Sequence, residues 1–242
     1  MNRLARTLFT IMIAVLPPWL SAASIEQIPD FSARYTVNKA DLNIISLTIT
    51  LERGPGKIEY RSAAEPIGIA SWFFGDHRIH EYSGLKQVAG NIVPLEYQYT
   101  HKGSDENENE QYIYDWRRNI AHVNYRGEAR TFKIPDGTLD NFSLQLALML
   151  DACAGQKKIA HPLISKGELK TYTFTNLGRE TIETPLGIFE SIKLERRKDD
   201  EENTTYTTWY ASELHYLPVK VENREDGDVE LSITLEEVNW QN

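Results

Sequence analysis

The chain has 242 residues, a formal net charge of −9 and a single cysteine, Cys153. The excess of acidic residues argues against nucleic acid and anionic membrane surfaces as general partners, because their phosphates would repel the chain. One cysteine cannot form a disulfide within the chain, so the fold has to depend on its hydrophobic core.

The first 23 residues have the three parts of a secretory signal peptide. Met1–Arg6 is basic, Leu8–Leu16 is apolar, and Ser21–Ala23 offers small residues at a cleavage site. We therefore expect export, cleavage after residue 23 and a periplasmic location. The cleavage site has no cysteine for acylation, so we do not expect a lipoprotein.

The rest of the chain, residues 24–242, is predicted to form one β-rich domain. No later apolar run approaches the roughly 18 residues of a membrane span, so we expect this domain to be soluble and to have no transmembrane segment. Residues 31–37, 45–51 and 57–64 carry apolar side chains at alternate positions. These three runs predict an antiparallel meander.

Pro66–Gly75 interrupts this pattern, because it has no two-residue periodicity and little charge. The segment could form a short helix or an apolar loop that plugs one end of the β core. Alternatively, it could line or cover a pocket for an apolar ligand, since loops on a β scaffold often carry binding residues. In that case the candidate ligand-binding residues are Ile67, Ile69, Trp72, Phe73 and Phe74.

Residues 77–134 continue as predicted strands, several of which place aromatic residues at alternate positions. These aromatic residues are Tyr97, Tyr99, Tyr112, Tyr114 and Trp116. We interpret them as core residues or cross-strand pairs. A platform on which a glycan stacks is the alternative.

Residues 138–153 give the one clear helix prediction. Helical spacing of large apolar residues indicates an amphipathic helix that packs on a sheet. Gly155 could end the helix, and Cys153 in its last turn is interpreted as a small buried residue. The candidate capping residues at its start are Asp136, Thr138 and Asp140.

The C-terminal part reads as a run of antiparallel strands joined by tight turns. Asp226-Gly227 is a strong hairpin signal. Apolar and polar residues alternate over residues 229–235. Apolar residues beyond Glu237 fall on the opposite parity, which predicts a bulge or a strand end near that position.

Several short motifs carry a family resemblance. They are Gly178-Arg179-Glu180, Thr184-Pro185-Leu186-Gly187-Ile188-Phe189, Trp209-Tyr210-Ala211 and Leu217-Pro218-Val219, with weaker matches at Phe31-Ser32-Ala33-Arg34-Tyr35 and Pro94-Leu95-Glu96-Tyr97. At these residues the chain resembles a family of bacterial secreted or periplasmic proteins, the domain-of-unknown-function family 3108. The resemblance implies a cell-envelope protein rich in β structure. It implies no catalytic residues, because the motifs consist of turn and core residues.

The sequence has no motif that indicates catalysis, a metal or a cofactor. His77 and His80 are the only histidines close together, and on a strand they would point to opposite faces, so they could not chelate one metal ion. No spacing selects an acidic pair for glycoside hydrolysis, such as Asp115 with Glu195 or Glu222. We therefore predict no catalytic residue, no metal site and no cofactor.

Together these features predict a mainly β fold, which is a curled antiparallel sheet or an incomplete β-barrel with one packed amphipathic helix at about residues 138–153. The leading hypothesis is a non-enzymatic envelope protein that binds an apolar or amphipathic ligand, such as a lipid, or a protein partner. The alternatives are a periplasmic hydrolase that acts on envelope glycans and a structural or assembly factor that acts through a protein interface.

Overall fold

The computed structural model describes residues 24–75, 77–103, 109–198 and 201–241. The predicted signal peptide lies outside the described residues. The strands form a single 15-stranded sheet in the spatial order β8-β7-β6-β5-β4-β3-β2-β1-β15-β14-β13-β12-β11-β10-β9. All neighbours are antiparallel except β9 and β10, which are parallel.

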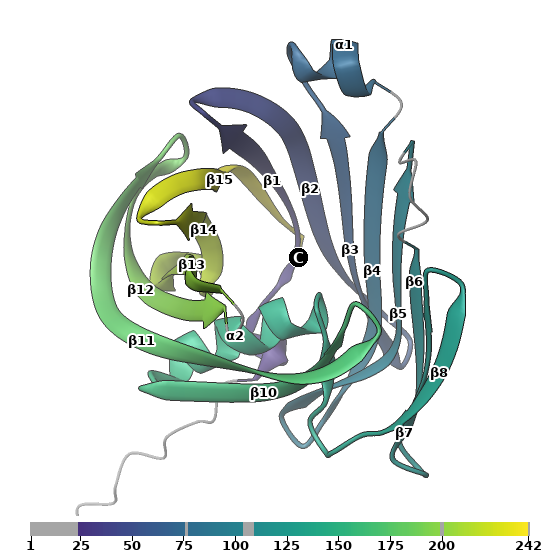
Figure 1. The fold of residues 1–242 in the computed structure, drawn as a ribbon. Coiled ribbons are helices and arrows are strands. Elements are labelled where there is room, and N and C mark those ends of the chain that lie inside the picture. The colour runs from purple at the N-terminus through teal and green to yellow at the C-terminus, as the bar shows by residue number, and fades with distance from the viewer. Residues whose placement is uncertain (1–23, 76, 104–108, 199–200, 242) are drawn as a thin grey trace, which may run out of the picture.

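The chain builds the sheet in two halves that meet in the middle. The first half runs outward and contains β1 (Asp30–Lys39), β2 (Leu42–Gly54), β3 (Lys57–Pro66), β4 (Arg78–Val88), β5 (Asn91–Lys102), β6 (Glu110–Asp115), β7 (Ile120–Tyr125) and β8 (Glu128–Lys133). The second half returns from the other edge and contains β9 (Leu139–Asp140), β10 (Lys158–Ser165), β11 (Glu168–Thr184), β12 (Gly187–Lys198), β13 (Glu201–Ala211), β14 (Leu217–Glu225) and β15 (Asp228–Gln241). The first and last strands therefore lie side by side (Figure 1).

The described residues also contain four helical segments. α1 (Ala70–Phe74) lies between β3 and β4, and α2 (Ser143–Ala154) lies between β9 and β10. Short 3-10 helices occupy Ile25–Gln27 and Ser212–Leu214. α1 projects from one end of the sheet, whereas α2 lies within the curl (Figure 1).

The sheet curls without closing into a barrel. Its edge strands are β8 and β9, and in the described part of the chain no ladder joins them. Instead, β9 lies against β5, and the β10–β11 turn rests on β6 to β8. There the amide of Gly167 donates to the Tyr112 hydroxyl at 3.4 Å, and the Arg130 guanidinium donates to the Gly167 carbonyl at 3.5 Å. The predicted fold class, a curled antiparallel sheet or incomplete barrel with a packed helix, is confirmed.

Replacing Gly167 with alanine should test this overlap of the two halves. Gly167 has φ +71°, and a Cβ there would lie 2.8 Å from the Cβ of Tyr125 on β7. We expect a loss of about 2 kcal/mol in the free energy of unfolding, from left-handed strain and the clash together, measured by urea denaturation. The matched control is Gly137→Ala, with φ +75° and no atom within 4 Å. Equal losses in the two variants would contradict the described packing.

The core lies on the face of the sheet that α2 covers, called the inner face below. Phe31, Leu51 and Tyr60 are cross-strand neighbours on β1, β2 and β3, and all three are almost fully buried. Phe142, just before α2, stacks on Tyr60 with ring centroids 4.1 Å apart. The buried residues of α2 are Ser143, Leu144, Leu146, Ala147, Leu148, Met149 and Ala152. The helix is thus buried on most of its circumference.

The ends of α2 confirm some of the helix prediction and correct the rest. Asp140 caps the start, because its Oδ1 accepts hydrogen bonds from the amides of Phe142 at 3.0 Å and Ser143 at 2.7 Å. The helix begins at Ser143 rather than at residue 138, since Leu139 and Asp140 pair with β10 instead. Gly155 ends it with φ +68°. The predicted burial of Cys153 is wrong, because this residue of the last turn is exposed.

The C-terminal strands follow the predicted turn chemistry. Asp226 and Gly227 have φ values of 51° and 90°, which suit a tight hairpin between β14 and β15. Arg34 faces Glu237 while Tyr35 faces Leu235, so Glu236 is the extra residue of a bulge. The bulge explains why the apolar residues change parity there.

Candidate ligand-binding site

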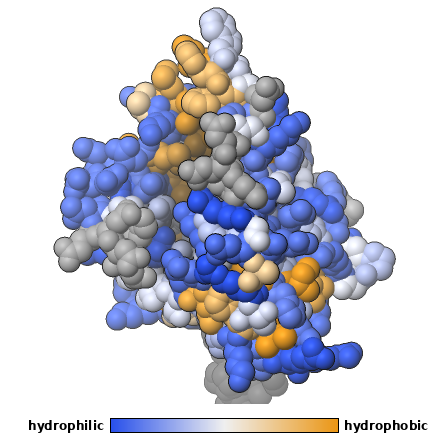
Figure 2. Space-filling model, turned by 45° about the vertical axis from the view of Figure 1, so that its right-hand side comes forward, coloured by the Kyte–Doolittle hydropathy of each residue, from blue (hydrophilic) through white to orange (hydrophobic). Residues whose placement is uncertain are grey.

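An apolar groove of about 380 Å³ lies where α1 covers the ends of β1 to β5. Ala64 pairs with Ile79, and Ile79 pairs with His101, so these side chains share the inner face. Figure 2 shows apolar side chains gathered at this end of the molecule around a recess. The groove is lined by Lys39, Ile44, Ile45, Ala64, Glu65, Pro66, Ala70, Phe74, His77, Ile79 and His101.

Local hydrogen bonds hold α1 over the groove. Gly68, with φ +57°, turns the chain out of β3, and its carbonyl accepts from the Ser71 hydroxyl at 2.7 Å. At the other end, the Arg78 guanidinium donates to the carbonyls of Gly75 at 2.7 Å and His77 at 2.8 Å. No residue of α1 is buried. The interpretation of this segment as a plug of the β core is therefore wrong.

The polar groups of the groove lie at its rim. Glu65 is neutralised by Arg78, with Nε 3.4 Å from Oε2. His77 Nδ1 lies 3.1 Å from His101 Nε2, so one ring donates a hydrogen bond to the other. Lys39 is exposed and makes no ion pair with another described residue. Among the described residues of the rim, positive charge is therefore in excess, although the chain as a whole is acidic.

The structure separates the five predicted ligand-binding residues into two groups. Phe74 lines the groove. The other four, Ile67, Ile69, Trp72 and Phe73, do not line it. Trp72 and Phe73 are 86% and 74% exposed and form an apolar tip on α1.

Sequence reasoning missed the strand residues of the groove. Ile45, Ala64 and Ile79 follow the ordinary two-residue periodicity of strands, which does not distinguish a groove from a core. The proximity of His77 and His101 depends on the pairing of β4 with β5. His80, by contrast, lies on the outer face, since it alternates with Ile79. One sequence signal could have indicated these residues. The alternation of apolar residues continues to the ends of the strands that lie next to α1.

A second, larger groove of about 840 Å³ lies along the surface of α2 at the β4–β5 turn. Its lining mixes apolar residues such as Val88, Ile92 and Leu150 with charged ones. His161 Nε2 and Asp151 Oδ2 lie 2.7 Å apart at its edge. His161 and Asp151 interact with each other, so this pair does not indicate a particular ligand.

Buried acidic residues lie where β9 meets β4, β5 and β6. Asp140 is fully buried, and its Oδ2 accepts a hydrogen bond from Ser83 at 3.0 Å. Glu81 accepts one from Tyr97 at 2.7 Å, and Glu110 accepts one from Tyr112. The pKa of Glu81 is raised to about 7, mainly by burial. The Tyr97 hydrogen bond opposes this shift, whereas the nearby carboxyls of Asp140 and Glu110 add to it. Burial likewise raises the pKa of Asp140 to about 6.

These carboxyls do not resemble an accessible catalytic pair. Asp140 and Glu110 are 0% and 8% exposed and are hydrogen-bonded to the protein. Glycoside hydrolysis requires two carboxyl groups that flank the sugar bond, so both must reach the substrate. The cluster instead joins β9 to the inner face of β4, β5 and β6.

The acidic pairs that the sequence left open are also engaged with basic groups. Glu195 and Glu222 line one small cavity with Trp209, but Glu222 contacts Lys220 and Arg224, each at 2.7 Å. Burial of Glu222 opposes its ionisation, yet these two cations lower its pKa. Asp115 lies elsewhere, where it accepts from backbone amides of the β6–β7 turn.

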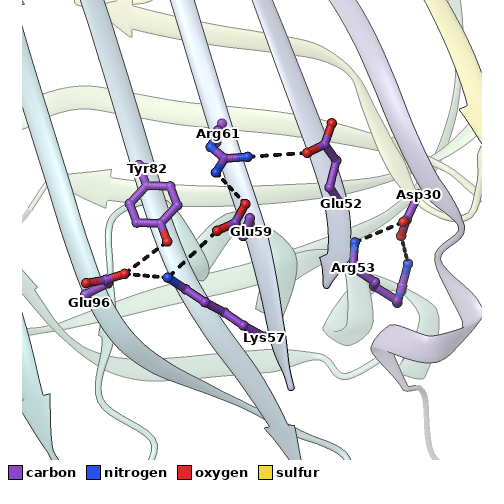
Figure 3. Close-up of polar contacts among 8 residues, drawn as sticks. All are labelled: Asp30, Glu52, Arg53, Lys57, Glu59, Arg61, Tyr82 and Glu96. Carbon is purple, nitrogen blue, oxygen red and sulfur yellow. Dashed lines mark hydrogen bonds and ion pairs between the residues drawn. The ribbon is translucent and has the colours of Figure 1, made fainter. Parts of the chain in front are cut away.

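A network of charged side chains crosses the sheet on the face opposite the core (Figure 3). The Lys57 ammonium lies 2.5 Å from Glu96 and 3.8 Å from Glu59. Glu96 also accepts from the Tyr82 hydroxyl at 3.0 Å. The Lys57 hydrogen bond lowers the pKa of Glu96. Gly84 leaves room for this arrangement, because a Cβ there would lie 2.5 Å from the Lys57 side chain.

Figure 3 also shows how the network extends to β2. Arg61 pairs with Glu59 and with Glu52, whereas Arg53 and Asp30 form a separate pair between β2 and β1. Each of these charges has a partner, so the network ties β2 to β5 together, the separate pair ties β1 to β2, and neither leaves a charge for a ligand. The network also gives Glu96, part of a weaker family motif, a structural role.

Two further features are absent from the described residues. These residues contain no group of three or more histidine, cysteine or acidic residues placed to hold a metal ion. Neither do they contain a helix with the length and hydrophobicity needed to cross a membrane.

Comparisons with known proteins place the fold. Residues 30–234 match the family model described as "Protein of unknown function (DUF3108)". No curated protein matches the chain. The solved structure of a beta-barrel-like protein of domain of unknown function DUF1849 from Brucella abortus is similar, with TM-score 0.56 and 9% identity, covering 89% of this chain and 99% of that one. A protein with a YmcC-like fold from Bacteroides fragilis has TM-score 0.34 and 12% identity, with 88% and 98% of the two chains covered.

Proposed function

The chain belongs to the DUF3108 family, as its motifs suggested, and we propose that it is an exported envelope protein that binds the apolar part of an amphipathic lipid in the groove beneath α1. Residues 1–23, with the features of a signal peptide, support export to the periplasm. The family description assigns no activity, so the proposal rests on the groove.

The observation that carries the proposal is the apolar groove beneath the exposed α1. Its floor consists of inner-face side chains such as Ile45, Ala64 and Ile79, and Phe74 forms part of its cover. The volume of about 380 Å³ falls within the usual range for ligand pockets, about 300–1,000 Å³. Burial of an acyl chain there would be favoured by about 0.8 kcal/mol for each methylene group.

The exposed tip of α1 supports the same function. Exposed contiguous apolar surface on a protein marks an interaction site. Trp72 and Phe73 contribute nothing to the core, since both are mostly exposed, and they lie on the helix that carries Phe74. We propose that the tip extends the apolar surface along which a lipid chain reaches the groove.

Native mass spectrometry of the protein, purified gently from its own cell envelope, tests this function. We expect a co-purifying mass of lipid size that organic extraction removes. The triple variant Trp72→Ser, Phe73→Ser, Phe74→Ser should lose at least about nine tenths of this adduct, because the loss of one apolar contact of this size weakens binding about tenfold. Its thermal stability should be unchanged, since α1 has no buried residue.

The matched control is Ile188→Ser. Ile188 is 66% exposed at the turn between β11 and β12, so its replacement also removes exposed apolar surface but leaves the groove intact. This variant should keep the adduct. An adduct that persists in the triple variant, or that is absent from the unmodified protein, would contradict the proposal. If the triple variant unfolds, the description of α1 as an external element is wrong.

The structure gives less support to the other functions considered. Hydrolysis of a glycan needs accessible carboxyls, whereas Glu110 and Asp140 are buried and Glu222 is paired with cations. A protein partner could contact the tip of α1. The groove has no explanation in that case, so the lipid is the better occupant.

A further inference from the structure

The charges around the groove indicate which class of amphiphile it takes. The rim has two groups of basic side chains, Lys39 and the His77–His101 pair. Among the described lining residues the one acidic side chain, Glu65, is neutralised by Arg78 at 3.4 Å. A chain with formal net charge −9 repels anions in general, so a local excess of positive charge beside an apolar groove favours an anionic head group at this place.

The size of the groove limits the apolar part of the ligand. A volume of about 380 Å³ lies near the lower end of the range for ligand pockets. The lining on the strand side consists mainly of two adjacent cross-strand pairs, Ile45 with Pro66 and Ala64 with Ile79. This shape fits one acyl chain rather than two.

We propose that the groove binds an anionic amphiphile with a single acyl chain, whose carboxylate or phosphate lies beside Lys39 and the His77–His101 pair. This inference rests on the proposed lipid-binding function and specifies its ligand class. The acyl chain contacts Ile45, Ala64 and Ile79, and Phe74 covers it. The ammonium of Lys39, which has no ion-pair partner among the described residues, supplies the opposite charge.

Calorimetric titration with four probes that share a dodecyl chain tests the proposal. The probes are dodecanoate, dodecyl phosphate, dodecyl maltoside and dodecyltrimethylammonium, each used below its critical micelle concentration. Both anionic probes should bind more tightly than the neutral one, by up to about fivefold, the gain expected from one exposed ion pair. The cationic probe should bind most weakly. A preference between carboxylate and phosphate would identify the source of the head group.

Lys39→Gln isolates the charge without altering the apolar lining. It should weaken the binding of the two anionic probes by up to about fivefold and leave the binding of dodecyl maltoside unchanged. The matched control is Lys133→Gln, an exposed lysine on β8, which should change none of the affinities. From decanoate to dodecanoate, affinity should rise about fourfold for each added methylene. It should stop rising once the chain fills the groove.

The outcomes separate this inference from the function on which it rests. If the anionic and neutral probes bind with equal affinity, and Phe74→Ser abolishes the binding of both, the proposed lipid-binding function stands but the anionic ligand class is overturned. Tighter binding of the cationic probe, or no effect of Lys39→Gln on the anionic probes, would also overturn it. If no probe binds, both the ligand class and the proposed function fail. Circular dichroism establishes that each variant is folded.

Discussion

Replacing Phe142 with alanine is expected to lower the free energy of unfolding by about 3–5 kcal/mol, the usual cost of removing a buried aromatic ring. Phe142 is 1% exposed and stacks on Tyr60 at 4.1 Å with an interplanar angle of 18°. It lies immediately before α2, between Asp140 and Ser143. Its ring therefore connects the start of the buried helix to β3, and its loss leaves a cavity against the inner face of that strand.

Chemical denaturation of the Phe142→Ala variant measures this effect directly. The matched control is Phe73→Ala, which removes the same side chain from a site that is 74% exposed and should change stability little. Phe142→Leu should recover part of the loss, because it fills some of the cavity. A loss of less than about 1 kcal/mol in Phe142→Ala would show that Phe142 is not packed on Tyr60 as described.

The features that the sequence predicted well are those that depend on neighbouring residues. The hairpin at Asp226-Gly227 follows from left-handed backbone conformations that these residue types adopt readily. The bulge at Glu236 follows from a change of parity within one strand. The Asp140 cap is similarly local, because its carboxyl binds amides two and three residues away. Local preference and final structure agree at these positions.

Long-range pairing decided the features that were missed. Leu139 fits a helical pattern, yet it pairs with Leu163 on β10, and that contact is 24 positions away in the chain. No local pattern shows that β1 and β15 are neighbours. The apolar character of α1 was clear from its residues, whereas its exposure depends on the strands ending below it. Lys39 and His101 reach the groove only through the order of strands in the sheet.

Stability should also fall as the pH rises from about 4.5 to about 7, because the pKa of Glu81 is about 7 in the folded protein and 4.5 in its ordinary environment. Burial is the main cause, and the carboxyls of Asp140 and Glu110 add to it. Between these two pH values the folded state holds more protons than the unfolded state, so each rise in pH favours unfolding. The titration of Glu81 thus lowers the free energy of unfolding by up to about 3 kcal/mol at pH 7 and above.

Glu81→Gln removes this titration and should raise the free energy of unfolding at pH 7.5 by up to about 3 kcal/mol, while changing it little at pH 4. Glutamine keeps an oxygen that can accept the Tyr97 hydrogen bond. The pH dependence that remains should include that of Asp140, whose pKa of about 6 is also raised by burial. Urea denaturation at half-unit steps from pH 4 to pH 8 measures the two curves.

Tyr97→Phe should have the opposite effect on the pH dependence of stability, because the Tyr97 hydroxyl donates the hydrogen bond that lowers the pKa of Glu81. Without it, the pKa of Glu81 rises further, and the loss of stability with pH becomes larger and extends to higher pH. The pair of variants therefore separates titration of this carboxyl from a general loss of packing, which would lower stability by the same amount at every pH. Curves parallel to that of the unmodified protein in both variants would show that Glu81 does not titrate in this range. In that case the cluster at β9 would be held by its hydrogen bonds alone.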